Sequence, residues 1–180
     1  MRIIGGLYRG KKLLSPSTTD IRPTADKARE SVFNILFSKL DKQWQEITIA
    51  DIFCGTGAFG LEAVSRGVKQ VALVDININA ATKNVALFPQ EKNKISLIKA
   101  NAINLPFSAK QYDVIFMDAP YQQNLSEKTL ASVIEKKWLS PNGICIVETA
   151  HDEELPIPEN MEVIDIRKYG IAKFHFITFK

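Results

Sequence analysis

The chain has 180 residues, of which 46% are hydrophobic and 24% are charged, as expected for one globular domain or a main domain with a small appendage. No apolar run approaches the ~20 residues that span a bilayer, and no apolar signal region stands at the start. Two cysteines are too few for a disulfide framework, so we expect a reduced, cytoplasmic chain. Residues 1–40 hold eight Lys or Arg and three acids, whereas the remainder holds 15 and 17. A basic front end indicates a polyanion partner such as nucleic acid, or a solvated terminal segment.

The first 45 residues are predicted to form a small basic extension. Turn signals at Gly5-Gly6 and Arg9-Gly10 predict a hairpin. Thr24 is predicted to cap a helix with Asp26 in its first turn. The helix should bury one apolar stripe made of Phe33, Leu36, Phe37 and Leu40.

Strands and helices then alternate over residues 46–180. Strands are predicted at 47–53, 70–75, 95–99, 112–117 and 143–148, and helices at 58–66, 79–87 and 126–136. Short apolar runs separated by helices are typical of a parallel sheet covered on both faces. Residues 161–168 and 171–179 alternate around Tyr169-Gly170, which predicts a final antiparallel hairpin.

A glycine-rich loop follows the first predicted strand. Gly55, Gly57 and Gly60 permit a tight turn and a close approach to a ligand at a helix start. The same spacing occurs in NAD-binding proteins, and Asp75 stands where an acid accepts ribose hydroxyls. The glycines alone therefore leave NAD, S-adenosylmethionine and a purely structural turn open. Asp51 favours S-adenosylmethionine, because its carboxylate suits an ammonium group and would repel a pyrophosphate.

The tetrapeptide Asp118-Ala119-Pro120-Tyr121 follows the fourth predicted strand, at the sheet edge where ligands bind. It resembles the (D/N)PPY motif of methyltransferases that act on planar amino groups. The Asp118 carboxylate and the Ala119 carbonyl could each accept one amine N–H, and Tyr121 could stack on a base. Ala119 replaces the usual proline, although Pro120 still favours an extended residue before it.

The order of these motifs over the whole chain resembles the RsmD-type 16S ribosomal RNA (guanine-N2)-methyltransferases. The resemblance includes the leading GGxxRGxxL hairpin, an RPTxDKxRExxFNxL segment at 22–36 and DxFxGTGxxGxEAxSRG at 51–67. Asn101 departs from the family, which usually has an acid there. The resemblance implies a Rossmann-like α/β fold with a mostly parallel seven-stranded sheet and an antiparallel last strand. It also implies an RNA-contacting extension at 1–45 and a methyltransferase domain at 46–180.

Site residues follow from the same resemblance. The implied cofactor, S-adenosylmethionine, would be held by Asp51, Phe53, Gly55, Gly57, Asp75, Ile76, Asn101 and Ala102. Catalysis would rest on Asp118, Ala119, Pro120 and Tyr121. The RNA would be contacted by Arg2, Arg9, Lys11, Lys12, Arg22 and Thr24.

The implied partner is 16S ribosomal RNA, either naked or within the small ribosomal subunit. We expect a monomer without a metal or a membrane partner. Methyltransferases of DNA adenine or of protein glutamine remain alternatives, because both substrates present planar amino groups. An NAD-dependent oxidoreductase would leave the tetrapeptide unexplained, and a non-catalytic RNA-binding module would require that S-adenosylmethionine does not bind.

Overall fold

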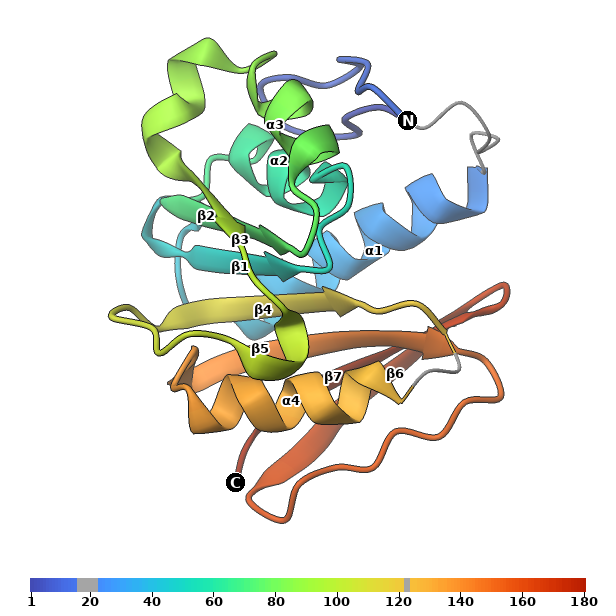
Figure 1. Ribbon diagram of the computed structural model, residues 1–180. Coiled ribbons are helices and arrows are strands. Elements are labelled where there is room, and N and C mark those ends of the chain that lie inside the picture. The colour runs from blue at the N-terminus through green and yellow to red at the C-terminus, as the bar shows by residue number, and fades with distance from the viewer. Residues whose placement is uncertain (16–22, 122–123) are drawn as a thin grey trace.

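Seven strands form one sheet in the order β3-β2-β1-β4-β5-β7-β6 (Figure 1). The structure, a computed structural model, describes residues 1–15, 23–121 and 124–180, with the backbone alone described for 23–25. The strands are β1 (Thr48–Ile52), β2 (Gln70–Asp75), β3 (Ile95–Lys99), β4 (Tyr112–Asp118), β5 (Leu139–Ala150), β6 (Met161–Tyr169) and β7 (Ala172–Phe179). Strands β1 to β5 pair in parallel, and β7 lies antiparallel between β5 and β6. The predicted fold class is therefore confirmed.

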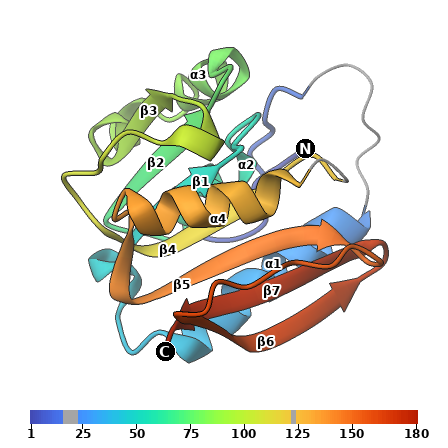
Figure 2. The same cartoon turned by 60° about the horizontal axis from the view of Figure 1, so that its bottom comes forward.

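Helices cover both faces of the sheet (Figure 2). The α-helices are α1 (Pro23–Lys39), α2 (Ala58–Ser65), α3 (Asn79–Val85) and α4 (Leu125–Glu135), and the short 3-10 helices are η1 (Trp44–Glu46), η2 (Pro89–Lys94) and η3 (Ala102–Asn104). Residues of α1, α2 and α3 share one hydrophobic core with one face of the sheet. Residues of α4 and η3 share a second core with the other face. Within the described ranges, no helix has the length and hydropathy needed to cross a membrane.

The continuous apolar runs of the central strands match their burial. In β1, Ile49 belongs to the core under α1 and α2, whereas Ala50 belongs to the core under α4. Because successive side chains point to opposite faces, a strand covered on both sides must be apolar at every interior position. The polar residues at the carboxyl ends of these strands, such as Asp75 and Asp118, therefore mark the edge where the core ends.

The C-terminal hairpin differs in detail from the sequence prediction. The turn between β6 and β7 consists of Gly170 and Ile171, because Tyr169 still pairs with Ala172. Gly170 has a φ of 59°, a left-handed conformation that glycine adopts without strain. Strand β5 is longer than predicted, since β4 and β7 pair with it on its two sides.

The hairpin predicted for the N-terminal segment forms, with an antiparallel bridge between Arg2 and Lys12 and a hydrogen bond from the Ile3 N–H to Lys11 O at 2.9 Å. Two other predictions for this region need correction. Helix α1 begins at Pro23, so Thr24 lies inside the helix and does not precede it as a cap. Phe37 is 56% exposed and contacts Trp44, whereas the buried face consists of Ala28, Val32, Phe33 and Leu36.

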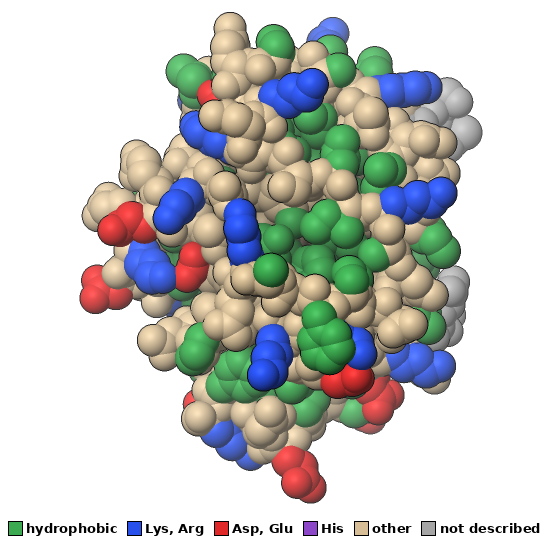
Figure 3. Space-filling model, turned by 60° about the vertical axis from the view of Figure 1, so that its left-hand side comes forward, with side chains coloured by type: hydrophobic (Ala, Val, Ile, Leu, Met, Phe, Trp, Pro, Cys, Tyr) green, Lys and Arg blue, Asp and Glu red, His purple; other side chains and the backbone are tan. Residues whose placement is uncertain are grey.

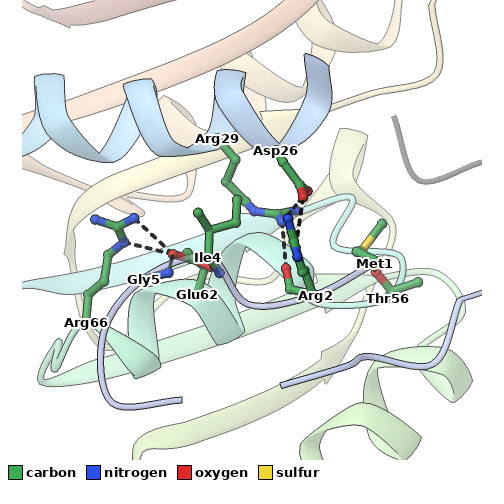
Figure 4. Close-up of polar contacts among 9 residues, drawn as sticks. All are labelled: Met1, Arg2, Ile4, Gly5, Asp26, Arg29, Thr56, Glu62 and Arg66. Atoms are coloured by element: carbon green, nitrogen blue, oxygen red, sulfur yellow. Dashed lines mark hydrogen bonds and ion pairs between the residues drawn. The ribbon is translucent and has the colours of Figure 1, made fainter. Parts of the chain in front are cut away.

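The N-terminal segment is fixed to α2 by a buried carboxylate (Figure 4). Both oxygens of Glu62 accept backbone N–H groups, from Ile4 at 2.7 Å and from Gly5 at 2.8 Å. Arg66 forms an ion pair with the same carboxylate at 3.0 Å. Ile3 and Leu13 join the core under α1 and α2, so this segment packs with the sheet.

Candidate active site

Two adjoining cavities lie at the carboxyl ends of the central parallel strands. The first has a volume of about 630 Å³ and the second of about 590 Å³. Phe53, Asp118 and Tyr121 line both cavities. A ligand that spans the two would therefore pass directly beside the predicted catalytic tetrapeptide, at the edge where open α/β sheets bind ligands.

The glycine loop between β1 and α2 is shaped by close contacts. Gly57 has a φ of 77° and directly precedes α2, and a Cβ atom on Gly60 would lie 2.3 Å from Leu73 Cδ2. The Gly55 N–H donates to Asp75 Oδ2 at 2.9 Å, and the Gly60 N–H donates to Asp51 Oδ2 at 2.9 Å. The two predicted acids, Asp75 and Asp51, thus each accept one backbone N–H of the loop.

The first cavity contains the predicted nucleoside contacts. It is lined by Phe53, Asp75, Ile76, Asn101 and Ala102, together with Ile103 and the tetrapeptide. Ile76 is 67% exposed, so an apolar face is open to a ligand. The Asp75 carboxylate accepts two backbone N–H groups, and its remaining lone pairs can accept a ribose diol. Oδ1 of Asn101 accepts the Ile103 N–H at 3.2 Å, which leaves the Asn101 NH2 group available to a base.

The second cavity contains the buried carboxyl group of Asp51 and the half-buried guanidinium of Arg29. Asp51 is 2% exposed, and burial raises its pKa to about 7, with smaller contributions from the charges of Asp118 and Asp75. Arg29 lines the same cavity, and burial lowers the pKa of its guanidinium. Its Nη2 donates to Arg2 O at 2.9 Å, whereas its buried Nε has no hydrogen-bond partner among the described residues (Figure 4). The Asp51 carboxylate suits the ammonium group of an amino acid, and the Arg29 guanidinium suits its carboxylate. The pair therefore fits the two charged groups of an amino acid.

The tetrapeptide begins with the last residue of β4. Asp118 reaches solvent at the cavity wall but is surrounded by protein on most sides, and this burial raises its pKa to about 6. Ala119 is 3% exposed. The Tyr121 hydroxyl donates to Glu148 Oε1 at 2.8 Å, and burial together with the charge of Glu148 raises the pKa of Tyr121. Asp118 and Tyr121 therefore stand where the two cavities meet.

The basic residues proposed to contact RNA differ in how far their charges are already engaged, although Arg2 and Lys12 are neighbours across the antiparallel bridge. Arg2 pairs with Asp26 at 3.4 Å, and Lys11 lies over the rings of Tyr8 and Phe88. Arg9 and Lys12 are exposed. Arg22 and the Thr24 side chain lie outside the described residues.

Two further residues of the site were not predicted as functional. Glu148 ends the predicted fifth strand at the same edge as Asp118, and that position was the signal that could have identified it. In the sequence, Arg29 is only one residue of the segment 22–36 that resembles the family. Its position in the same cavity as Asp51 depends on how α1 packs, which the sequence does not show. In the described part of the chain, no three His, Cys, Asp or Glu side chains are grouped to hold a metal ion.

Comparison with known proteins identifies the family to which the chain belongs. Residues 1–178 match the family described as Conserved hypothetical protein 95. Ribosomal RNA small subunit methyltransferase D of Haemophilus influenzae is 31% identical over 97% of this chain and 91% of its own length. The enzyme of the same name from Escherichia coli K12 is 31% identical over 89% of this chain and 80% of its own length. The structure of YhhF, a candidate methyltransferase of Escherichia coli, has a TM-score of 0.82 at 25% identity and covers 100% of this chain and 98% of that one. The chain therefore belongs to the RsmD family of methyltransferases.

Proposed function

We propose that this protein uses S-adenosylmethionine to methylate the N2 amine of a guanine in 16S ribosomal RNA of the small subunit. The names of the relatives support a ribosomal RNA substrate. The observation that carries the proposal is the meeting of the two cavities at Asp118 and Tyr121. One cavity suits a nucleoside and the other an amino acid, and those are the two halves of the cofactor.

The residues present fit this cofactor. When bound, S-adenosylmethionine would supply an electrophilic methyl group on a sulfonium. Asp75 would hold the ribose hydroxyls, with Ile76 against the adenine. Asp51 would face the ammonium of the methionine part, and Arg29 would face its carboxylate. Gly55 has a φ of 54°, and a Cβ there would meet only Phe53 O at 4.0 Å, so the loop leaves room for a ligand above it.

Asp118 and Ala119 would prepare the weakly nucleophilic amine. The Asp118 carboxylate and the Ala119 carbonyl accept its two N–H groups and turn the nitrogen lone pair toward the methyl carbon. The nitrogen would form the new N–C bond as the S–C bond of the donor breaks, and the electron pair of the broken bond would stay on the sulfur. The amine then loses one proton to the Asp118 carboxylate, which passes it to water. Tyr121 would stack on the base once it leaves its loop.

The basic segment within 1–45 would contact phosphate groups, and residues 46–180 would form the methyltransferase domain. Arg9 and Lys12 are the exposed members of this set for which no ion pair occurs among the described residues. Phosphate contacts position a protein on nucleic acid, whereas the tetrapeptide would select the base.

Methyl transfer from labelled S-adenosylmethionine tests the proposal directly. Unmodified 16S ribosomal RNA and assembled small subunits are each incubated with the protein, and the labelled nucleotide is identified by mass spectrometry. We expect N2-methylguanine at one position. Asp118→Ala should lower the transfer rate by about 100-fold or more while the cofactor affinity stays the same. Label in DNA adenine or protein glutamine, with none in RNA, would contradict the proposal.

A further inference from the structure

Glu148 is a second carboxylate beside the proposed methylation site. It pairs in register with Asp118 across the parallel strands β5 and β4. Neighbouring strands are about 4.8 Å apart, and paired residues present their side chains on the same face of the sheet. Both carboxylates line the second cavity together with Tyr121. Burial raises the pKa of Glu148 to about 7, and the charge of Asp118 contributes further.

One oxygen of Glu148 is engaged and the other is available. Oε1 accepts the Tyr121 hydroxyl at 2.8 Å. Within the described part of the chain, Oε2 has no hydrogen-bond partner, and Glu148 is half-buried, not sealed in the core. An ionised carboxylate accepts hydrogen bonds and donates none. The wall of the cavity therefore offers two adjacent carboxylates that need N–H or O–H donors.

The Watson–Crick edge of guanine provides such donors. Its N2 amine stands beside N1–H, so the two groups present adjacent donors. The reactive amines of adenine and cytosine stand instead beside a ring nitrogen that carries a lone pair and no proton. A second carboxylate next to the amine site would attract the guanine edge and repel the other two edges. Bases that leave a loop are read along this edge by hydrogen bonds.

We propose that Glu148 is a specificity-determining residue that accepts the N1–H of the target guanine while Asp118 and Ala119 hold the N2 amine. This inference rests on the proposed function, and it names the residue that makes the same site select guanine. The hydrogen bond between the Tyr121 hydroxyl and Glu148 fixes the carboxylate and the stacking ring relative to each other. Discrimination then comes from an attractive contact with guanine and a repulsive one with its competitors.

The substitution Glu148→Gln separates base selection from a purely structural role. An amide oxygen at this position can still accept the Tyr121 hydroxyl, so the ring stays anchored. The amide NH2 can now donate to an unprotonated ring nitrogen. The probe is a synthetic RNA that carries the mapped target nucleotide as guanine or as 2-aminopurine, assembled into small subunits where the unaltered protein requires them. 2-Aminopurine keeps the amine at C2 but lacks the N1 proton.

We expect the unaltered protein to prefer guanine over 2-aminopurine, measured as the ratio of kcat/KM values. Glu148→Gln should reduce this preference by about 10- to 100-fold, the usual range for a hydrogen bond to a charged group. The exposed Glu154 lies in the loop after β5 and outside both cavities, so Glu154→Gln makes the same charge change as a matched control and should leave the ratio unaltered. Cofactor affinity and melting temperature are measured for each protein.

The outcomes distinguish this proposal from the one on which it rests. Absence of RNA methylation by the unaltered protein would defeat the proposed function. Methylation of guanine N2 with an equal preference in the unaltered protein and in Glu148→Gln would overturn the role of Glu148 alone. Equal rates on guanine and 2-aminopurine with the unaltered protein would also overturn the role of Glu148. That test uses the unaltered protein alone, so it does not depend on whether a variant folds.

Discussion

Three carboxyl groups with raised pKa values line the second cavity, and they make stability depend on pH. The values for Asp51, Asp118 and Glu148 are about 7, 6 and 7, chiefly because of burial. In the unfolded chain such groups titrate near pH 4, so between about pH 4 and pH 7 the folded protein binds more protons. The contribution of these groups to the free energy of unfolding is therefore largest in acid, and it falls as the pH rises through this window.

Asp51→Asn should remove part of that fall. The amide oxygen can still accept the Gly60 N–H, while no charge is buried. From pH 5 to pH 8 we expect the variant to lose about 2–3 kcal/mol less stability than the unaltered protein, as measured by urea unfolding. Asp152→Asn, at an exposed carboxylate, is the control. Identical pH profiles for Asp51→Asn and the unaltered protein would show that ionisation of Asp51 in the folded protein does not lower its stability.

Asp75 is expected to hold the cofactor ribose. Asp75→Ala should weaken the binding of S-adenosylmethionine by about 1–3 kcal/mol, because a hydrogen bond to a charged group is lost. Isothermal titration calorimetry measures this loss. Asp152→Ala, on the exposed loop after β5, should bind the cofactor as the unaltered protein does. Unchanged affinity for Asp75→Ala would remove this residue from the site.

Among the elements, the contact of the N-terminal segment with α2 depends on one glycine. Gly6 has a φ of 77°, and a Cβ atom there would lie 1.9 Å from the backbone oxygen of Ser65. Gly10 has a similar φ of 85°, but a Cβ there would meet nothing within 4 Å. Gly6→Ala should cost about 3 kcal/mol or more through strain and displacement, and Gly10→Ala about 1 kcal/mol through strain alone. Equal losses in denaturant unfolding would mean that the segment does not need this close approach.

The sequence predicts the strands well and the packing of the N-terminal region poorly, for one physical reason. Strands β1 and β2 are buried on both faces, so their apolar runs have no other stable arrangement. Helix α1 is covered on one face only, and its spacing alone did not show that Phe37 lies outside the contact. Glu148 is similar, because its role depends on the neighbour that β4 brings to it, and no local motif records that pairing.

At the scale of the whole molecule, positive charge is less concentrated than the sequence indicates. Lys and Arg side chains are spread over the whole face drawn in Figure 3, with hydrophobic side chains exposed between them. Several cations of residues 1–40 already have acidic partners, since Arg2 and Arg29 pair with Asp26 and Lys39 pairs with Asp165. Such pairs reduce the charge that the basic segment presents to RNA. Arg9 and Lys12, both exposed, are then the strongest candidates for phosphate contacts.

Replacing Arg9 and Lys12 together with Gln should weaken RNA binding and flatten its dependence on salt. Each phosphate contact releases counterions, so the slope of log affinity against log salt should decrease by roughly 0.7–0.9 per contact, or about 1.4–1.8 for the pair. Lys69, just before β2, and Lys180, just after β7, are also exposed but lie outside the N-terminal segment. Replacing these two with Gln makes the same change in net charge and should alter the slope much less. Equal slopes for the two double variants would mean that only net charge matters. A reduced slope confined to Arg9 and Lys12, with cofactor affinity unchanged, would locate the path of the RNA along the N-terminal segment.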